Sequence, residues 1–327
     1  MSRENRSFRI DPFIVALLLA AVVGSLMPAR GVGITVVSIL TQVAVSLLFF
    51  LQGVRLQRAA VIAGATHWRL QLLTLFSTFA VFPILGVALY ACIPGVIGDS
   101  LWTGVLYLCV LPSTVQSSIA FTSIARGNVP AAICAATASN LLGIALTPLL
   151  VSVVLGLHGS PTSFAQIESI VLQLLAPFFA GQVLSRWLRP WATRHAVLLS
   201  ITDRGSIVLV VYASFGAAVL ANAWVPLAWT QVAVLLLLCA LLLAAVLCFT
   251  RFASRAFGFS REDESTVVFC GSKKSLVTGV PMANILFPAA TAGLVILPLM
   301  IFHQMQLVVC SVIARRYARQ VAAVCDV

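Results

Sequence analysis

Acidic residues are scarce in this 327-residue chain. It contains nine Asp and Glu residues against twenty Lys and Arg, and charged residues make up only 9% of the sequence. Every acidic residue lies in a tail, in a loop or near the end of an apolar segment. This absence argues against a cation/proton antiporter that works through a buried aspartate, and against a pigment whose Schiff base needs a carboxylate counter-ion.

Metal-binding and catalytic patterns are also missing. The eight cysteines show no CxxC or Cys/His metal spacing and fall mostly within apolar segments, where we expect them to be buried. Ser272, Lys274 and Ser275 lie too close together to form an evident nucleophile–base pair, although Ser117 could approach from another helix. The arginines are scattered rather than gathered in one patch, which gives a nucleic-acid partner little support. We therefore expect no metal, no cofactor and no enzyme.

Long apolar stretches dominate what is present. Hydrophobic residues make up 61% of the chain, a composition typical of integral membrane proteins. About 20 apolar residues cross the hydrocarbon core as a helix, and ten such stretches predict an all-α polytopic protein with ten transmembrane helices. The stretches are Pro12 to Met27, Val32 to Gln52, Leu70 to Ala91, Leu101 to Ala125, Pro130 to Leu155, Ile167 to Ser185, Gly205 to Ala223, Trp229 to Thr250, Ser265 to Phe287 and Ala289 to Ala314.

The arginines predict the orientation of these segments. With the N-terminus inside, seventeen basic residues fall in cytoplasmic loops and tails, Arg30 falls outside, and the two lysines fall within a segment. Positively charged loops remain cytoplasmic, so we expect both termini inside a multi-pass protein of the bacterial inner membrane. Anionic lipid head groups of the cytoplasmic leaflet are the expected partners. The stretch from Arg186 to Arg204 is predicted to be a cytoplasmic connection.

An internal repeat appears when the chain is shifted by 158 residues. The run from Pro130 to Ala132 then overlies the run from Pro288 to Ala290, and segment one falls on segment six. Because each unit has five crossings, the second copy is inverted in the membrane, a recurrent design of secondary transporters. We predict one repeat over residues 1–158 and another over 159–327. The first segment could be mistaken for a cleaved signal, but its removal would break this repeat.

The fourth segment of each repeat carries an unusual polar interruption. Segment four has Pro112 followed by hydroxyl and amide residues, and segment nine has Gly271 followed by the only two lysines of the chain. Pro or Gly followed by hydroxyl residues suits a discontinuous helix, and a charge at this depth costs roughly 3 kcal/mol. The candidate site residues are Ser113, Thr114, Gln116, Ser117 and Ser118 in segment four, and Cys270, Ser272, Lys273, Lys274 and Ser275 in segment nine.

Other polar residues in the apolar segments give weaker signals. Asn140 in segment five and His303 in segment ten could line a cavity, although hydrogen bonds between helices explain them equally well. Gln304 and Gln306 are open to the same two interpretations. Ser260 is predicted to cap the start of segment nine.

Two stretches resemble the bile acid:sodium symporter superfamily. They are LPSTVQSSIAFTSIARGNVPAAICAATASNLLGIALTPLL from Leu111 to Leu150 and FCGSKKSLVTGVPMANILFP from Phe269 to Pro288, in which GSKKSLVTG resembles the YfeH-like branch. The resemblance implies a panel domain and a core domain, with broken helices four and nine crossing in the core. It also implies a substrate cleft beside that crossing and alternating access.

The resemblance also implies changes at the family's sodium sites. The glutamate and glutamine ligands of helix nine correspond to Cys270 and Lys274, and a helix-three glutamine corresponds to Thr78. A helix-four Ser-Asn pair becomes Ser117 and Ser118, and alanines occupy the helix-five hydroxyl positions. A hard cation needs several oxygen ligands and is repelled by a fixed ammonium, so these changes argue against sodium coupling.

We therefore predict a secondary transporter, with an organic anion as its small-molecule substrate. The hypothesis for Lys274 is a tethered cation that bridges backbone carbonyls and hydroxyls where sodium would sit. Lys273 would share this role or attract the anion, and either lysine could instead exchange a proton. A neutral substrate remains an alternative, and so does a regulatory membrane protein that retains a transporter fold but moves no solute.

Overall fold

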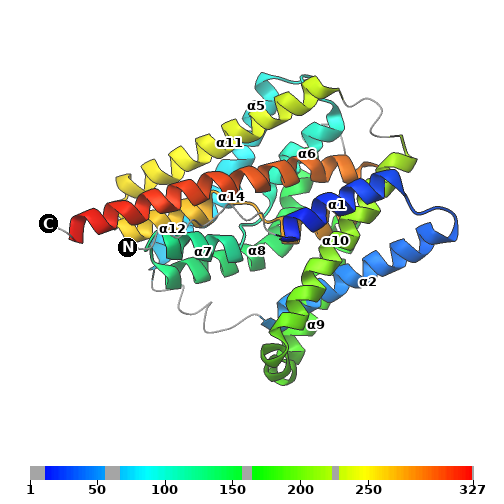
Figure 1. The fold of residues 1–327 in the computed structure, drawn as a ribbon, viewed down its shortest axis with the longest axis horizontal. Helices are drawn as coiled ribbons and strands as arrows, with labels where there is room; N and C mark the ends of the chain where they lie inside the picture. Colours follow the sequence, from blue (N-terminus) through cyan, green and yellow to red (C-terminus); the bar gives the residue numbers. More distant parts are fainter. Residues whose placement is uncertain (1–11, 56–66, 157–163, 223–227, 326–327) are drawn as a thin grey trace, which may run out of the picture.

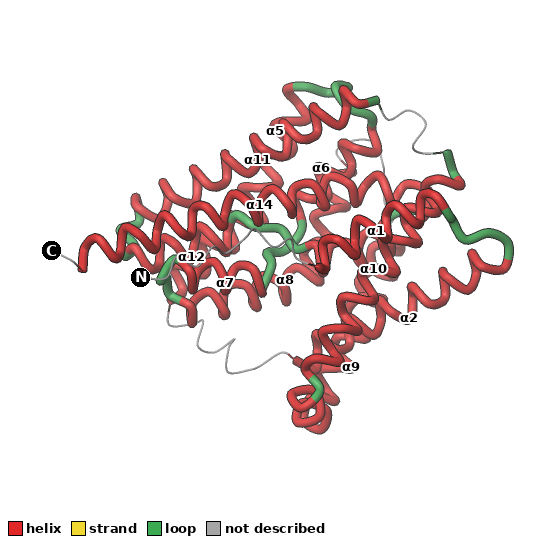
Figure 2. Tube along the Cα trace, viewed as in Figure 1, coloured by secondary structure: helices red, strands yellow, loops and turns green. Residues whose placement is uncertain are grey.

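The computed structural model describes residues 12–55, 67–156, 164–222 and 228–325, and within these ranges the regular elements are all helices (Figures 1 and 2). Six of them are long and apolar enough to cross a membrane, and two shorter apolar helices are Val15–Leu26 and Asp99–Val110. The all-helical polytopic architecture is thus confirmed. The six long spans are Val32–Arg55, Trp68–Cys92, Val129–Gly156, Ala196–Leu220, Trp229–Ala256 and Ala289–Gln320.

One bundle contains α1 (Pro12–Leu26), α2 (Val32–Arg55), α9 (Phe164–Arg194) and α10 (Ala196–Leu220). Within it, α2 packs along α9 and α1 packs along α10 (Figure 1). Glycines allow both close approaches: a Cβ atom on Gly53 or Gly181 would lie 2.0 Å from a backbone oxygen of the facing helix. On the other pair, a Cβ atom on Gly24 would lie 2.6 Å from the carbonyl oxygen of Tyr212. Small residues let membrane helices approach this closely.

The second bundle holds the remaining helices. It shares the main apolar core with the first bundle, and α14 packs against both α6 and α10. Its elements are α4 (Trp68–Phe76), the π-helical turn η2 (Ser77–Val81), α5 (Phe82–Cys92), α6 (Asp99–Val110), α7 (Gln116–Ile124), α8 (Val129–Gly156), α11 (Trp229–Ala256), α12 (Arg261–Gly271), α13 (Leu276–Leu286) and α14 (Ala289–Cys325).

Several helices extend beyond the predicted apolar stretches. The predicted connection from Arg186 to Arg204 is wrong as a loop, because α9 continues to Arg194 and α10 begins at Ala196. A single non-helical residue, His195, separates the two helices, and its N–H still donates to the carbonyl of Trp191 at 3.0 Å. The hydropathy pattern placed the end of segment six at Ser185, before Arg186. The helix continues to Arg194 because its backbone hydrogen bonds do not depend on whether the side chains are apolar.

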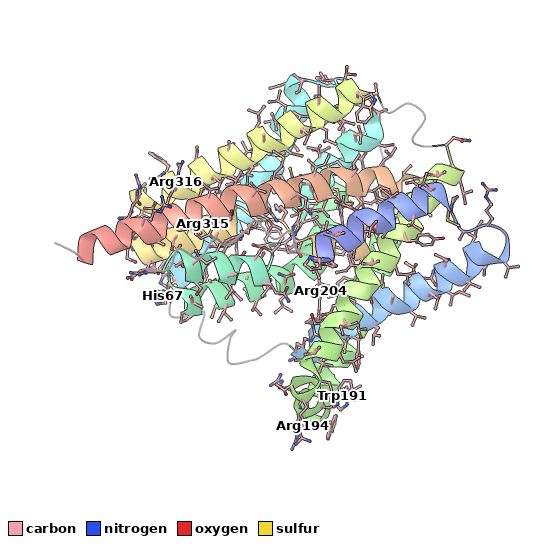
Figure 3. The ribbon with its side chains drawn as sticks, in the orientation of Figure 1. His67, Trp191, Arg194, Arg204, Arg315 and Arg316 are labelled. Atoms are coloured by element: carbon pink, nitrogen blue, oxygen red, sulfur yellow. The ribbon has the colours of Figure 1, made fainter. Side chains whose placement is uncertain are left out.

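The two predicted polar interruptions coincide with gaps between helices. Helix α6 ends at Val110 and α7 begins at Gln116, while α12 ends at Gly271 and α13 begins at Leu276. The start of α12 is capped as predicted, since Ser260 Oγ accepts from the N–H of Asp263. Figure 3 shows Arg315 and Arg316 at the same end of the molecule as the C-terminus, and the α1–α2 loop lies toward the opposite end (Figure 1).

Candidate functional site at the two helix breaks

The two breaks are hydrogen-bonded to each other. The N–H of Ser275 in the second break donates to the carbonyl of Pro112 in the first, at 2.8 Å. In return, Ser113 Oγ donates to the carbonyl of Cys270 at 2.5 Å, and Ser118 Oγ donates to the carbonyl of Phe269 at 3.0 Å. Backbone groups freed by a break must find partners where water is absent, and here each break supplies partners for the other.

Helix α8 satisfies other backbone groups of the first break. Thr147 Oγ1 donates to the carbonyl of Val110 at 3.0 Å, and Asn140 Nδ2 donates to the carbonyl of Ser113 at 2.6 Å. The N–H of Ser113 donates to Ser139 Oγ at 3.0 Å. Asn140, which the sequence left open between cavity lining and packing, therefore holds the first break in place.

Lys274 occupies a closed site in which three backbone carbonyls surround its ammonium. Nζ donates to the carbonyl oxygens of Thr78, Cys109 and Leu111 at 2.8, 2.8 and 2.7 Å. The ring of Phe82 lies below it, with its centroid 4.1 Å from Nζ, and the side chain is fully buried. An ammonium has three N–H donors and no acceptor, so its donors are all used.

The π-helical turn explains why Thr78 offers a carbonyl. In the π register a carbonyl accepts from the N–H five residues later, as Ser77 does from Phe82. The residue five positions after Thr78 is Pro83, which has no N–H. The hydroxyl of Thr78 is not involved, since it donates to the carbonyl of Thr74. Thr78, which the resemblance places at the site, contacts the ammonium through its backbone carbonyl rather than through its side chain.

The other two carbonyls are free because α6 ends beside them. In a continuous helix the carbonyl of Cys109 would accept from the N–H of Ser113, but that N–H donates to Ser139. Leu111 lies in the break itself, one residue after the last helical residue, Val110. We call the carbonyls of Thr78, Cys109 and Leu111 the carbonyl cage. They are free to bind Lys274 because Pro83 has no N–H, because α6 ends at Val110, and because the Ser139 hydroxyl accepts the N–H of Ser113.

Lys273 has a different environment. Its Nζ donates to a single acceptor, the carbonyl of Ser117 at 2.8 Å. The Phe121 ring centroid lies 3.9 Å away and that of Phe269 lies 5.7 Å away. Rings attract a cation through their faces but accept no strong hydrogen bond. Although both lysines are fully buried, only Lys274 joins separate segments through all of its donors.

Gln306 of α14 holds the backbone of Lys274. Its Oε1 accepts from the Lys274 N–H at 2.9 Å, and its Nε2 donates to the Lys274 carbonyl at 3.0 Å. His303 Nδ1 lies 2.8 Å from the same Nε2. One amide side chain thus replaces the two helical hydrogen bonds that the break removes. His303, which the sequence predicted to belong to the site, contacts the side-chain amide of Gln306.

The remaining predicted residues have local roles. Ser272 Oγ donates to the carbonyl of Val268, and Ser275 Oγ caps α13 by accepting from the N–H of Thr278. Thr114 Oγ1 lies 2.7 Å from Ser117 Oγ. Gln116 is exposed at the start of α7 and lies outside this hydrogen-bond network.

Sequence reasoning missed several partners of the breaks. Ser139, Thr147 and Tyr107 were not singled out, and Gln306 was noted only as a weak signal. The hydroxyl of Tyr107 donates to the carbonyl of Gly279 in α13 at 2.6 Å. A polar side chain in an apolar helix was the available signal, but its partner lies 172 residues away and only folding brings the two together.

A cleft of about 360 Å³ lies in the first bundle, between α2 and α10, and extends to the end of α13. Helices α2 and α10 form its walls, and Asn284 and Ile285 of α13 close it on the side of the second bundle. Asn284 Nδ2 donates to Ser214 Oγ of α10 at 2.6 Å, so a hydrogen bond joins the bundles there. Thr41 lines the cleft with a buried hydroxyl that has no hydrogen-bond partner within the part of the chain that the structure describes. The described lining residues carry no charge.

Helices long and apolar enough to cross a membrane, together with two helix breaks that are hydrogen-bonded to each other, are features of secondary transporters. The chain matches the SBF-like CPA transporter family over residues 11–319 and belongs to that family. The resemblance that the two broken segments indicated is thereby confirmed. The protein is a multi-pass integral membrane protein of a transporter family.

Similar proteins extend over nearly the whole chain. The putative symporter YfeH of Escherichia coli strain K12 is 49% identical over 314 residues, 96% of this chain and 95% of the relative. An uncharacterized protein of Pseudomonas aeruginosa is 50% identical over 321 residues, 98% and 96% of the two chains. Sodium/bile acid cotransporter 7 of Mus musculus is 26% identical over 317 residues, 93% and 92% of the two chains. The functional names are those of transporters rather than enzymes, and the bacterial relatives indicate the inner membrane.

Proposed function

We propose that the protein is a secondary transporter that moves an organic anion by alternating access, without sodium. The observation that carries this proposal is the Lys274 ammonium, which three carbonyls from two segments hold at the meeting point of the broken helices. A cation at this point organises the breaks, and a lysine supplies it covalently. The transporter therefore needs no ion from solution to complete the junction.

The fold supports the two moving parts that alternating access requires. The bundle of α1, α2, α9 and α10 would act as the panel and the remaining helices would act as the core, and the cleft in the panel bundle reaches the core at Asn284 and Ile285. We propose that α6–α7 and α12–α13 each count as one interrupted span, which gives ten spans in two inverted repeats, 1–158 and 159–327. The paired contacts of α2 with α9 and of α1 with α10 fit such a repeat, because inversion exchanges the two pairs.

An organic anion is the substrate class that we propose. Both ammonium groups are bonded to the protein, so anion recognition would rely on a helix start. Helix α7 begins at the first break, at the exposed Gln116, without a side-chain cap, and the start of a helix carries partial positive charge that favours a carboxylate or sulfate. The apolar residues among the uncharged lining of the cleft would contact the hydrocarbon part of an amphipathic anion. The name of the mouse relative, which refers to bile acid, points in the same direction.

Sodium coupling lacks oxygen side chains at several of the positions that the resemblance identifies. Cys270 presents a buried thiol whose Sγ lies 3.8 Å from the carbonyl oxygen of Ala132, and a thiol is a poor ligand for a hard cation. Ala131, Ala132 and Ala135 offer no side-chain oxygen at all.

Uptake into proteoliposomes tests this proposal. A labelled bile acid and a panel of labelled mono- and dicarboxylates should accumulate or exchange with wild type in sodium-free buffer, and an imposed sodium gradient should add nothing. Lys274→Gln should reduce the rate roughly tenfold or more, the effect of about 1.4 kcal/mol. Protein-free liposomes are the control.

Two results would contradict the proposal in different ways. Accumulation that requires a sodium gradient would leave transport standing but refute the sodium-free mechanism. The absence of both uptake and counterflow for every solute would refute transport, and would favour the regulatory membrane protein that retains this fold.

A further inference from the structure

We infer that the carbonyls of Thr78, Cys109 and Leu111 form a binding site for a primary ammonium ion, which Lys274 fills permanently. The inference deepens the proposed sodium-free function, but it concerns a binding site and its test does not use transport. Three carbonyl oxygens at 2.7–2.8 Å match the three donors of one R–NH₃⁺ group. A neutral amine has only two N–H donors and would leave one of these carbonyls unpaired.

The cage is built by groups other than the lysine. Pro83 has no N–H to donate to the carbonyl of Thr78. The N–H of Ser113, which would donate to the carbonyl of Cys109 in a continuous helix, donates to Ser139 Oγ instead. The hydrogen bond from Ser275 to Pro112 and the Gln306 contacts hold the two breaks without using Nζ. These features remain when the Lys274 side chain is shortened, so the carbonyls stay directed at an empty space.

The substitution Lys274→Ala leaves a space of defined shape. The missing atoms run from Cγ to Nζ, which is the skeleton of n-propylammonium. The ring of Phe82, 4.1 Å from Nζ, adds the face of an aromatic ring to the floor of the site, and such a face favours a cation over a neutral group. The site therefore selects a small primary alkylammonium by length, by donor number and by charge.

Lys273 provides the matched comparison within the same chain. It is equally buried and adjacent in sequence, yet its ammonium has one carbonyl partner and two aromatic rings. Shortening Lys273 therefore leaves a space without the three-acceptor cage. The structure assigns a selective ammonium site to Lys274 and none to Lys273.

Thermal unfolding of the purified full chain in detergent, with and without added amines, tests the inference. Lys274→Ala and Lys274→Met should each lower the unfolding midpoint by about 5 °C or more, because three buried carbonyls lose their donors. n-Propylammonium should raise the midpoint of Lys274→Ala by more than half of the loss, in a saturable way. It should leave wild type, Lys274→Met and Lys273→Ala unchanged, since their sites are filled or lack the cage.

Three probes separate the ammonium site from nonspecific effects. 1-Propanol has nearly the same shape without charge, tetramethylammonium has charge without donors, and n-hexylammonium is too long for the space. None of them should restore Lys274→Ala. Recovery with 1-propanol equal to that with n-propylammonium would overturn the inference, because filling space would then suffice.

Two further outcomes would also refute the site. One is the absence of any recovery by n-propylammonium when it is present throughout purification. The other is a Lys274→Met variant as stable as wild type, which needs no amine to interpret and remains informative if Lys274→Ala fails to fold. Neither result measures transport, so the ammonium site and transport itself can fail separately; loss of the site would remove the support for the sodium-free mechanism alone.

Discussion

At the residue scale, the breaks depend on side chains that take over backbone hydrogen bonds. Gln306 bonds both the N–H and the carbonyl of Lys274, while Ser113 and Ser118 bond carbonyls of the facing break. In membrane, a backbone group without a partner costs several kcal/mol. These polar residues are isolated from one another in the sequence, but in the folded protein their hydrogen bonds together stabilise the two breaks.

Gln306→Leu should destabilise the protein by about 2–4 kcal/mol, because it leaves the buried N–H of Lys274 unpaired and removes the shorter of two contacts to the Lys274 carbonyl, which also lies 3.4 Å from His303 Nδ1. Chemical or thermal unfolding in detergent measures this change. Gln304→Leu is the matched control: Gln304 lies two residues away on the same helix and is partly exposed. Equal stability of the two variants would mean that the Gln306 contacts contribute nothing.

At the element scale, Pro83 connects a helix irregularity to the site. The π-helical turn Ser77–Val81 and the missing N–H of Pro83 together release the carbonyl of Thr78 for Lys274. π-Helical turns often mark functional positions in membrane and soluble helices. Here the π-helical turn leaves the carbonyl of Thr78 free to accept a hydrogen bond from Lys274.

Pro83→Ala should weaken the cage, because the new N–H competes with Lys274 for the Thr78 carbonyl. In the Pro83→Ala background, Lys274→Met should then cost less than in wild type, with a coupling energy of about 1 kcal/mol or more. Unfolding of the two single variants and the double variant measures this coupling. Pro148→Ala, within α8, is the control and should be additive with Lys274→Met; an additive Pro83 cycle would contradict the proposed competition.

At the scale of the whole molecule, two close helix pairs build the bundle that would act as the panel. Helix α2 approaches α9 through Gly53 and Gly181, and α1 approaches α10 through Gly24. The cleft lies where this bundle meets α13. Movement between bundles requires each of them to be rigid on its own, and close backbone contacts provide that rigidity.

Gly53→Ala should strongly destabilise the protein, by about 2 kcal/mol or more, because its Cβ would lie 2.0 Å from the carbonyl oxygen of Phe178 and the helices would have to separate. Gly205→Ala in α10 is the control, since a Cβ there meets nothing within 4 Å. Unfolding in detergent compares the two variants. A Gly53→Ala protein as stable as Gly205→Ala would show that the α2–α9 pair separates easily.

Much of the architecture follows from the sequence because its causes are local. Hydropathy predicts membrane helices, and Pro112 and Gly271 predict where two of them stop. Helix ends were the weaker part: α9 and α10 continue through Arg186 to Arg204, since a backbone that pairs with itself does not stop where its side chains become polar. The irregular turn at Ser77–Val81 had no predicted counterpart, because it depends on packing as well as on Pro83.

By itself, the sequence determined that this is a polytopic membrane protein of a transporter family, and that its two lysines lie at a break. Composition and the residues of the two broken segments carry that information. Only the tertiary structure decided what each lysine does, because both have the same neighbours in sequence and the same burial. The difference lies in the partners: three carbonyls from η2 and the end of α6 reach Lys274, and one carbonyl reaches Lys273. These acceptors are backbone atoms from distant segments, and their availability depends on which N–H groups the fold has already used.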